Sequence, residues 1–195
     1  MADHRLRAPL SRTQIENLRV GDSVRLDGTV LGIRDATLIR LIDERASPPV
    51  DLTGAVLLHT APGVKKVGGR YQPVSIGTTT SMRMDRFTEP LLRDHGVRAI
   101  IGKGGLSATS LEAFRQHSGC YLAIVGGAAA LETTQIEEIE AVYWEDLMPE
   151  CLWRFRVKEL GPLTVAMDAH GGNLYAEVMS RAEGRLQDIF SRLGL

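Results

Sequence analysis

The stretch VRAIIGKGGLSATSLEAFRQHSGCYLAIVGGAAAL, residues 97–131, decides the fold class. It starts with an apolar run that ends in a glycine-rich loop, continues at helical spacing, and then repeats the plan from Cys120. Short apolar runs closed by glycine are typical of buried strands. Residues 73–95 have the same order, with PVSI as the strand and Met84 to His95 as the helix. Three strand–loop–helix units in succession predict an α/β domain whose loops gather at the carboxyl ends of the strands.

The rest of the chain supplies further elements around these units. Four segments have the composition of strands: residues 23–33 (a strand or a hairpin), 54–60, 153–160 and 162–169. KKVGGRY predicts a turn. A helix is expected over residues 35–46, with Asp35 as its N-cap. The tail, about residues 173–193, has apolar residues three to four apart and predicts an amphipathic helix packed on the body of one domain, residues 1–195.

The composition limits the classes of function. Lys and Arg number 23 and Asp and Glu number 24, so the net charge is −1, which argues against a general binder of nucleic acid or of membrane surfaces. Aromatic residues make up 5%, which is few for a surface that stacks on bases. The sequence has no apolar run long enough to cross a bilayer and starts without an apolar signal segment. Cys120 and Cys151 stand among apolar residues and are expected to be reduced core residues of a cytoplasmic protein.

The first loop of interest is VSIGTTTSMRMD, residues 74–85, where three threonines and Ser81 precede Arg83. One such hydroxyl at the start of a helix caps it, and capping is the simplest interpretation. Four hydroxyls exceed what a cap requires. Arg83 follows Thr79 by four residues, so one helical turn would bring a hydroxyl and a guanidinium to one face near a helix N-terminus. That arrangement favours an anion.

Two more loops carry cations. IIGKGG, residues 100–105, lacks the glycine spacing of a phosphate-binding P-loop. Its glycines would let the backbone approach a ligand, with Lys103 at the end of a buried strand. The alternative interpretation of this sequence is a tight turn with an exposed lysine. GIRDAT places Arg34 beside Asp35, where an exposed ion pair with a helix cap is the alternative to a role in binding.

Together these segments resemble a known family. The resemblance runs in order over nearly the whole chain, through SVRLDGTVLGIRDA, VSIGTTTSMRMD, IIGKGG, MPECLW and VKELGPLTVAMDAHGGNL. It is to the β subunit of L(+)-tartrate dehydratase and the C-terminal domain of class I fumarases. Thr-Thr-Ser-Met-Arg-Met followed by Gly-Lys-Gly-Gly about one α/β unit later is its specific part. The resemblance implies a swivelling-domain fold of β/β/α layers, in which a mixed sheet or partial barrel packs against helices. It also implies an iron–sulfur hydro-lyase that acts on a four-carbon hydroxy dicarboxylate.

By motif, the resemblance assigns the family's site to Arg34, Thr79, Arg83 and Lys103. The three cations would bind substrate, Lys103 would also assist catalysis, and Thr79 would be the base. The chemistry agrees, because arginine grips a carboxylate with two charge-assisted hydrogen bonds. Fixed cations also stabilise the extra negative charge that builds when a proton leaves a carbon next to a carboxylate. Thr79 is a poor base unless nearby positive charge lowers the pKa of its hydroxyl.

The cofactor is expected on another chain. In the enzymes that this sequence resembles, three cysteines of the α part bind a [4Fe-4S] cluster. Such a cluster needs three or four thiolates, and this chain has two cysteines. The resemblance therefore implies a partner α subunit that carries the cluster, in an α2β2 assembly, with no metal on this chain.

The sequence departs from the family pattern at three places near the expected site. Leu38 stands at a His position, Thr78 replaces the proline before the Thr pair, and Ala61 lies in a His-Thr-Ala-Pro segment where His-Ala-Gly-Pro is usual. The identity of the substrate is therefore undecided between L-tartrate and malate or fumarate. The sequences of the motifs favour L-tartrate. A non-catalytic subunit that binds carboxylates or serves assembly is the alternative function.

Overall fold

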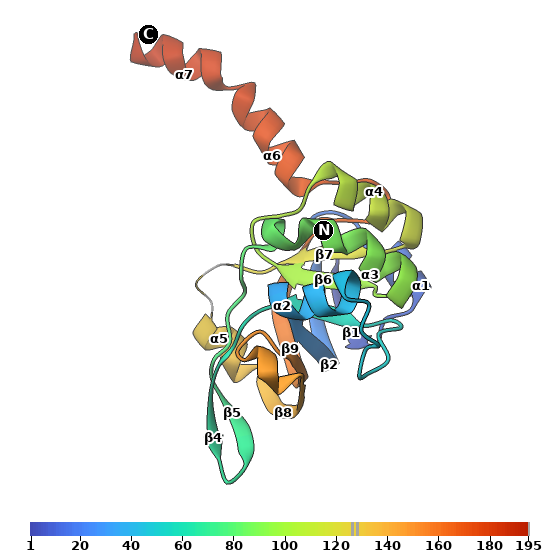
Figure 1. The fold of residues 1–195 in the computed structure, drawn as a ribbon. Coiled ribbons are helices and arrows are strands. Elements are labelled where there is room, and N and C mark those ends of the chain that lie inside the picture. Colours follow the sequence, from blue (N-terminus) through green and yellow to red (C-terminus); the bar gives the residue numbers. More distant parts are fainter. Residues whose placement is uncertain (126, 128, 195) are drawn as a thin grey trace.

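The computed structural model describes residues 1–125, 127 and 129–194, and its centre is a seven-stranded sheet in the order β1-β2-β3-β6-β7-β9-β8 (Figure 1). The strands that pair in parallel are β1 (Asp3–Ala8), β2 (Ser23–Ile33), β3 (Val56–His59), β6 (Ala99–Gly102) and β7 (Cys120–Ala123). The antiparallel strands are β9 (Leu152–Met167) and β8 (Ile136–Tyr143). Because β9 pairs with both β2 and β7, five strands close into a partial barrel. The expected mixed sheet with a partial barrel is confirmed.

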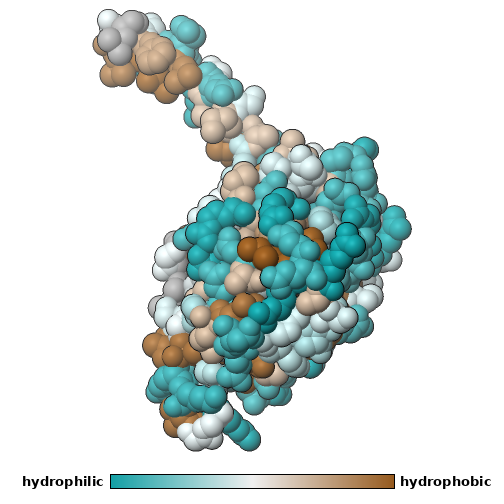
Figure 2. Space-filling view, viewed as in Figure 1, coloured by the Kyte–Doolittle hydropathy of each residue, from teal (hydrophilic) through white to brown (hydrophobic). Residues whose placement is uncertain are grey.

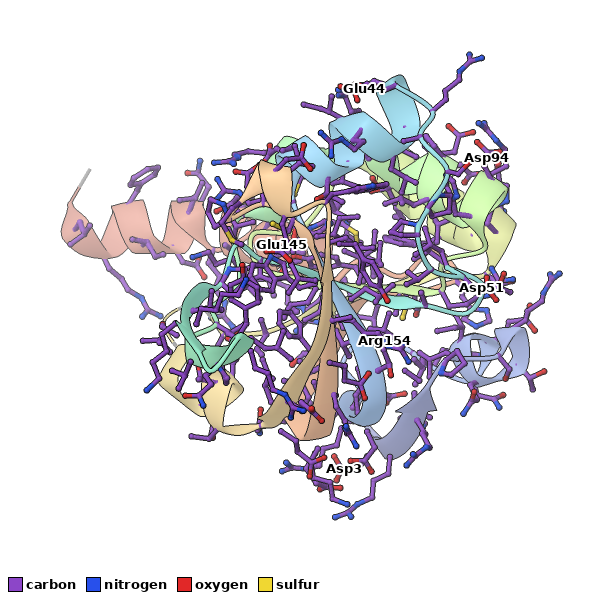
Figure 3. The ribbon with its side chains drawn as sticks, turned by 60° about the horizontal axis from the view of Figure 1, so that its bottom comes forward. Asp3, Glu44, Asp51, Asp94, Glu145 and Arg154 are labelled. Carbon is purple, nitrogen blue, oxygen red and sulfur yellow. The ribbon has the colours of Figure 1, made fainter. Side chains whose placement is uncertain are left out.

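Two hydrophobic cores cover the two faces of this sheet. Successive residues of a strand point to opposite faces, so Ile101 of β6 belongs to one core and Ile100 to the other. The first core fills the barrel around Trp153, and side chains occupy the space that the strands enclose (Figure 3). The second core lies between the outer face of the sheet and two helices, α3 (Thr88–His95) and α4 (Ala108–His117).

Strand β9 corrects the prediction of two strands over residues 153–160 and 162–169. The structure has one strand of 16 residues. The expected break is a bulge, because Glu159 and Gly161 have φ angles of +50° and +142° and the register with β2 shifts there. A Cβ at position 161 would lie 2.6 Å from the backbone oxygen of Val24, so this position requires glycine. The bulge lets one strand pair with β8, β2 and β7.

The helix after β2 also differs in detail from its prediction. α2 (Asp35–Leu38) continues as a π-helix over Ile39–Asp43. Its N-cap is Arg34, not Asp35, and no side chain caps it. Asp35 is the first helical residue, and its carboxylate pairs with two arginines, as described below.

The remaining elements are short. The predicted turn in KKVGGRY joins a hairpin of β4 (Gly63–Val67) and β5 (Arg70–Ser75), while β2 is a single strand rather than a hairpin. The expected helix from Met84 to His95 is a 3-10 helix (Ser81–Phe87) followed by α3. The glycine-rich loop expected after β7 includes residues 126 and 128, which lie outside the described part, and α5 (Ala129–Thr134) follows it. Sequence analysis did not predict β1, β8, α1 (Arg12–Glu16) or the 3-10 turn Glu145–Leu147. Among the described residues, no helix is long and apolar enough to cross a membrane.

The C-terminal tail corrects the prediction of a helix packed on the body. Two helices, α6 (Leu174–Glu183) and α7 (Leu186–Leu193), extend away from the body (Figure 1). Their apolar residues form an exposed stripe at the top of Figure 2: Val178, Met179, Leu186, Ile189, Phe190 and Leu193. Only the root is attached, where the ring of Tyr175 lies against Gly105. The apolar period predicted one helix over this span, whereas the structure has two, separated at Gly184 and Arg185. The period also does not say which surface the stripe will meet.

Candidate active site

The predicted cations lie at one edge of the sheet. Because β2, β3, β6 and β7 are parallel, their carboxyl ends meet at the same edge. Arg34 directly follows β2, and Lys103 directly follows β6. The sequence prediction that these loops gather at the carboxyl ends of the strands therefore holds for both residues.

The segment of residues 78–81 is held between the ends of β3 and β6. It forms an antiparallel bridge on the β3 side and a parallel bridge on the β6 side. The backbone N–H of Thr79 donates to the carbonyl oxygen of His59 at 2.8 Å, and that of Ser81 donates to the carbonyl oxygen of Lys103 at 2.9 Å. These two bonds hold Thr79 between the ends of two strands, before the 3-10 helix begins. The expectation that one helical turn aligns it with Arg83 is therefore wrong.

The four hydroxyls of this segment do not cap the helix that follows. The N-cap is Thr80, and its side chain makes no capping hydrogen bond. Ser81 is fully buried and hydrogen-bonds to His59 and Tyr121. In the described part of the chain the Thr79 hydroxyl has no hydrogen-bond partner, and Thr79 is half-buried. Capping, the simplest interpretation of these residues, is thus not their role in the structure.

Arg34 and Arg83 meet on one carboxylate. The Asp35 oxygen Oδ2 lies 2.7 Å from a terminal guanidinium nitrogen of Arg83 and 3.1 Å from Nε of Arg34. Nε of Arg34 also lies 3.3 Å from Oε1 of Glu150. Burial raises the pKa of Asp35, but the hydrogen bonds and charges of Arg83 and Arg34 outweigh burial and hold that pKa below its ordinary value. The pair is therefore an ionised bridge that orients two arginines at one side of the site, with Arg83 about half exposed.

The glycines of the Lys103 loop serve close packing. A Cβ on Gly102 would lie 1.9 Å from the Ser81 hydroxyl oxygen, and one on Gly105 would lie 3.0 Å from the ring of Tyr175. Gly105 also has a φ of +72°. The loop is thus pressed between the threonine segment and the root of α6, and it leaves the Lys103 side chain half-buried. No ion pair of this lysine occurs within the described residues.

A buried hydrogen-bond relay runs beneath the site, and sequence analysis did not identify it. The Tyr121 hydroxyl donates to Ser81 Oγ at 2.9 Å. The Ser81 hydroxyl is then left to donate to Nδ1 of His59, also at 2.9 Å. This direction puts the His59 proton on Nε2, an atom that is buried and without a partner in the described part of the chain. Burial lowers the pKa of His59 to about 4, although the charge of Asp35 raises it, so the ring is neutral.

A second buried group is Glu132, of α5. Its side chain is 2% exposed, and Oε2 has no hydrogen-bond partner among the described residues. Burial raises the pKa of Glu132 to about 7, while the charge of Lys103 and a hydrogen bond from the Thr78 backbone act to lower it. No sequence motif signalled Glu132, because a helical glutamate is ordinarily a solvated residue.

A separate hollow lies away from these residues. It measures about 290 Å³ and is lined by Pro9, Leu31, Asp51 and Arg154, among others; Figure 3 labels the last two. The lining includes Ala55, at the amino end of β3, which is the edge opposite to Arg34 and Lys103. None of the lining residues is a predicted site residue, so the chemistry favours the carboxyl edge.

The two cysteines do not fit an iron–sulfur cluster. Cys120 and Cys151 are both buried, in β7 and just before β9. Burial raises the pKa of both thiols, whereas a cluster is bound by thiolates. The described residues also contain no group of three or more His, Cys, Asp or Glu side chains arranged to hold a metal. The described residues of this chain therefore do not fit such a cluster.

The carboxyl edge of the barrel thus carries two arginines joined on one carboxylate, a lysine, and a threonine hydroxyl without a partner among the described residues. Groups of this kind suit an anion with carboxylate groups. Comparison with known proteins places the chain in a family. The family model described as "Fumarase C-terminus" matches residues 2–178. The chain belongs to this family.

Similar proteins include subunits of dehydratases and a longer enzyme. The chain is 42% identical over 173 residues to the "L(+)-tartrate dehydratase subunit beta" of Escherichia coli (strain K12), covering 88% of this chain and 86% of that protein. It is 36% identical over 185 residues to the "Putative L(+)-tartrate dehydratase subunit beta" of Methanocaldococcus jannaschii, covering 92% and 95%. It is 38% identical over 175 residues to the "Putative fumarate hydratase class I" of Geobacillus stearothermophilus, covering 89% of this chain and 34% of that one.

The burial of His59 generates a prediction about pH and stability. Its folded pKa of about 4 lies below the ordinary value of 6.5, so the unfolded chain binds more protons and the contribution of His59 is lost as pH falls from 6.5 towards 4. His59→Asn lacks this ionisation. Chemical denaturation should show the gap in unfolding free energy between wild type and His59→Asn shrinking by about 2 kcal/mol from pH 7 to pH 5. A gap that stays constant would mean that the folded protein protonates His59 freely.

Proposed function

We propose that this chain is the β subunit of an iron–sulfur hydro-lyase that reversibly dehydrates a four-carbon hydroxy dicarboxylate. L-tartrate is the first candidate substrate, and malate or fumarate is the second. The observation that carries the proposal is the match, over 88% of the chain, to a protein named as the β subunit of L(+)-tartrate dehydratase. The charge of the site supports it, since Arg34, Arg83 and Lys103 suit an anion with two carboxylates.

In this proposal the chain binds the substrate and moves a proton. Arg34 and Arg83 hold one carboxylate, because Asp35 already orients both guanidinium groups and leaves Arg83 half exposed. Lys103 faces the developing negative charge from the other side of the threonine segment. Cations fixed before the reaction stabilise the anionic transition state more than the ground state. Thr79 is the candidate base, since its hydroxyl has no partner within the described residues and its backbone is fixed by the bond to His59.

A partner α subunit belongs to the proposal, with the [4Fe-4S] cluster on that partner and an α2β2 assembly. Two observations support it. The cysteines of this chain are too few and too buried for a cluster, and the Geobacillus relative contains the matching segment as 34% of a longer chain. A cytoplasmic location is also part of the proposal, supported by two buried cysteines that form no disulfide.

Reconstitution tests the function. The purified chain alone should be colourless and should not dehydrate L-tartrate, malate or their isomers. Co-purified under anaerobic conditions with an α subunit of a tartrate dehydratase, it should give a brown complex that forms oxaloacetate from L-tartrate. The readouts are the absorbance of the cluster and product formation. Turnover by the isolated chain would contradict the proposal, and a brown complex that binds dicarboxylates without turnover would favour the non-catalytic alternative.

Thr79→Val tests the assigned base. The change is nearly isosteric and removes only the hydroxyl, so kcat of the reconstituted enzyme should fall by roughly 10²–10⁴-fold with KM little changed. The matched control is Thr80→Val, one residue further on, where the side chain is exposed and caps nothing; this variant should keep wild-type kcat. Equal kcat in both variants would remove Thr79 from proton transfer.

Arg83→Lys tests the carboxylate grip. Lysine keeps the charge but loses the two-pronged hydrogen bonding of arginine, so kcat/KM should fall by the equivalent of about 1.5–3 kcal/mol. Arg86→Lys is the control, since Arg86 is exposed and pairs with Asp43. Steady-state kinetics compares the two. An Arg83→Lys enzyme with unchanged kcat/KM would show that Arg83 serves the Asp35 bridge alone.

A further inference from the structure

The carboxyl group of Glu132 lies against the elements that build the site. Glu132 is in α5, and its neighbour Thr133 accepts a hydrogen bond from the Ile76 N–H through Oγ1 at 2.8 Å. This bond fixes the end of α5 to the chain just before the threonine segment. The Glu132 side chain is 2% exposed, so it is held among protein atoms and not in solvent.

The hydrogen bonding of this carboxyl group is incomplete. Oε2 has no partner in the described part of the chain, and the Thr78 backbone N–H acts to lower the pKa of the carboxyl group. Thr78 stands where the related sequences were expected to carry proline, and proline has no N–H. The departure at Thr78 thus places an N–H group near Glu132.

Lys103 is the charged group that faces this carboxyl among the described residues. The other neighbours are uncharged: a hollow of about 170 Å³ beside Glu132 is lined by Ile124 and Val125 after β7, Leu131 and Gln135 near α5, and Gly161 and Pro162 of β9. Apolar surroundings favour the neutral acid, and one nearby ammonium favours the carboxylate. Glu132 is therefore balanced between its two protonation states, and whatever changes the charge beside Lys103 will shift that balance.

We propose that Glu132 balances the charge of the site by binding one proton from solvent when a dicarboxylate binds at Lys103. This inference rests on the proposed function. A substrate carboxylate that occupies Lys103 puts a second negative charge beside the only ammonium that faces Glu132 in the described chain, and like charges disfavour the ionised acid. The proton goes onto a Glu132 carboxyl oxygen and returns to solvent when the ligand leaves. Glu132 acts through Lys103, so it is a positioning residue that touches no substrate.

The pH dependence of substrate binding tests this proton uptake. In the reconstituted complex, KM for L-tartrate should rise roughly tenfold from pH 6 to pH 8, because above the pKa of free Glu132 each binding event must also take up a proton. Glu132→Gln resembles the neutral acid and should keep a low KM that does not change over this range. The control Glu137→Gln makes the same chemical change at an exposed position of β8 and should follow the wild-type profile.

Calorimetry counts the protons directly. Succinate has no hydroxyl to lose, and titrating it into the complex at pH 8 in two buffers of different ionisation enthalpy should report close to one proton taken up for wild type and Glu137→Gln, and close to none for Glu132→Gln. A flat wild-type KM overturns the inference even if Glu132→Gln assembles poorly. A Glu132→Gln profile that rises with the wild type overturns it as well. If no complex binds or turns over any dicarboxylate, the proposed function itself fails and this inference with it.

Discussion

The site depends on the insertion of the threonine segment between the ends of two parallel strands. Two backbone hydrogen bonds, Thr79 N–H to His59 and Ser81 N–H to Lys103, fix residues 78–81 between the ends of β3 and β6 through two isolated bridges. Buried backbone groups must find partners, and this pairing satisfies them while it leaves the side chains of the segment free for other uses. Ser81 then points into the core and holds the relay, whereas Thr79 keeps its hydroxyl without a partner in the described chain. One backbone arrangement thus separates a structural hydroxyl from a hydroxyl that is available to a ligand.

The charges around this segment are arranged in two groups. On one side, Asp35 and Glu150 hold Arg34, and Asp35 also holds Arg83. On the other side Lys103 has one buried acid nearby, Glu132, in apolar surroundings. The first group is exposed enough that its bridge is a modest contribution to stability, so its main consequence is orientation of the guanidinium groups. The second group, Lys103 and Glu132, is poorly solvated. A change of charge beside Lys103 therefore alters the protonation state of Glu132 and not the position of a side chain.

Much of the fold follows from the sequence because its strands are short apolar runs closed by glycine. That pattern located β6 and β7, and hence the edge that carries Lys103. Its third example, PVSI, was wrong as a strand of the main sheet, because it belongs to β5 of the two-stranded hairpin. It failed where tertiary structure overrides local signals. Gly161 and Pro162 predicted a break between two strands. The strand β9 nevertheless continues, because it pairs with β2 and β7 on the two sides of the bulge. The sequence pattern predicted that the tail packs on the body, but Leu186 and Phe190 are exposed in the structure. An amphipathic period does not specify which surface the apolar face of a helix meets.

The site residues illustrate the same limit. Arg34, Arg83 and Lys103 could be chosen from sequence, because cations in glycine-rich or hydroxyl-rich loops are unusual enough to notice. Asp35 was noticed too, but as a helix cap, since its contact with Arg83 spans 48 positions of the chain. Tyr121 and Glu132 gave no sequence signal, and His59 was noticed only as part of the His-Thr-Ala-Pro segment. Burial is what makes the three residues notable, and burial is a property of the folded chain.

Under the proposed function, the described residues account for binding of an anion more fully than for the whole reaction. Its described site offers donors and cations from one edge of a barrel, but both thiols are buried and protonated, and His59 is neutral and enclosed. Loss of water from a hydroxy acid needs an electrophile for the departing hydroxyl as well as a base for the proton. The donors at this edge can stabilise a dicarboxylate anion and hold it against Thr79, and none of them is an electrophile of that kind. Under the proposed function, the partner subunit would supply that electrophile at the carboxyl edge, where the loop of Lys103 packs on the root of α6. An exposed apolar stripe on α6 and α7 rises from that same root.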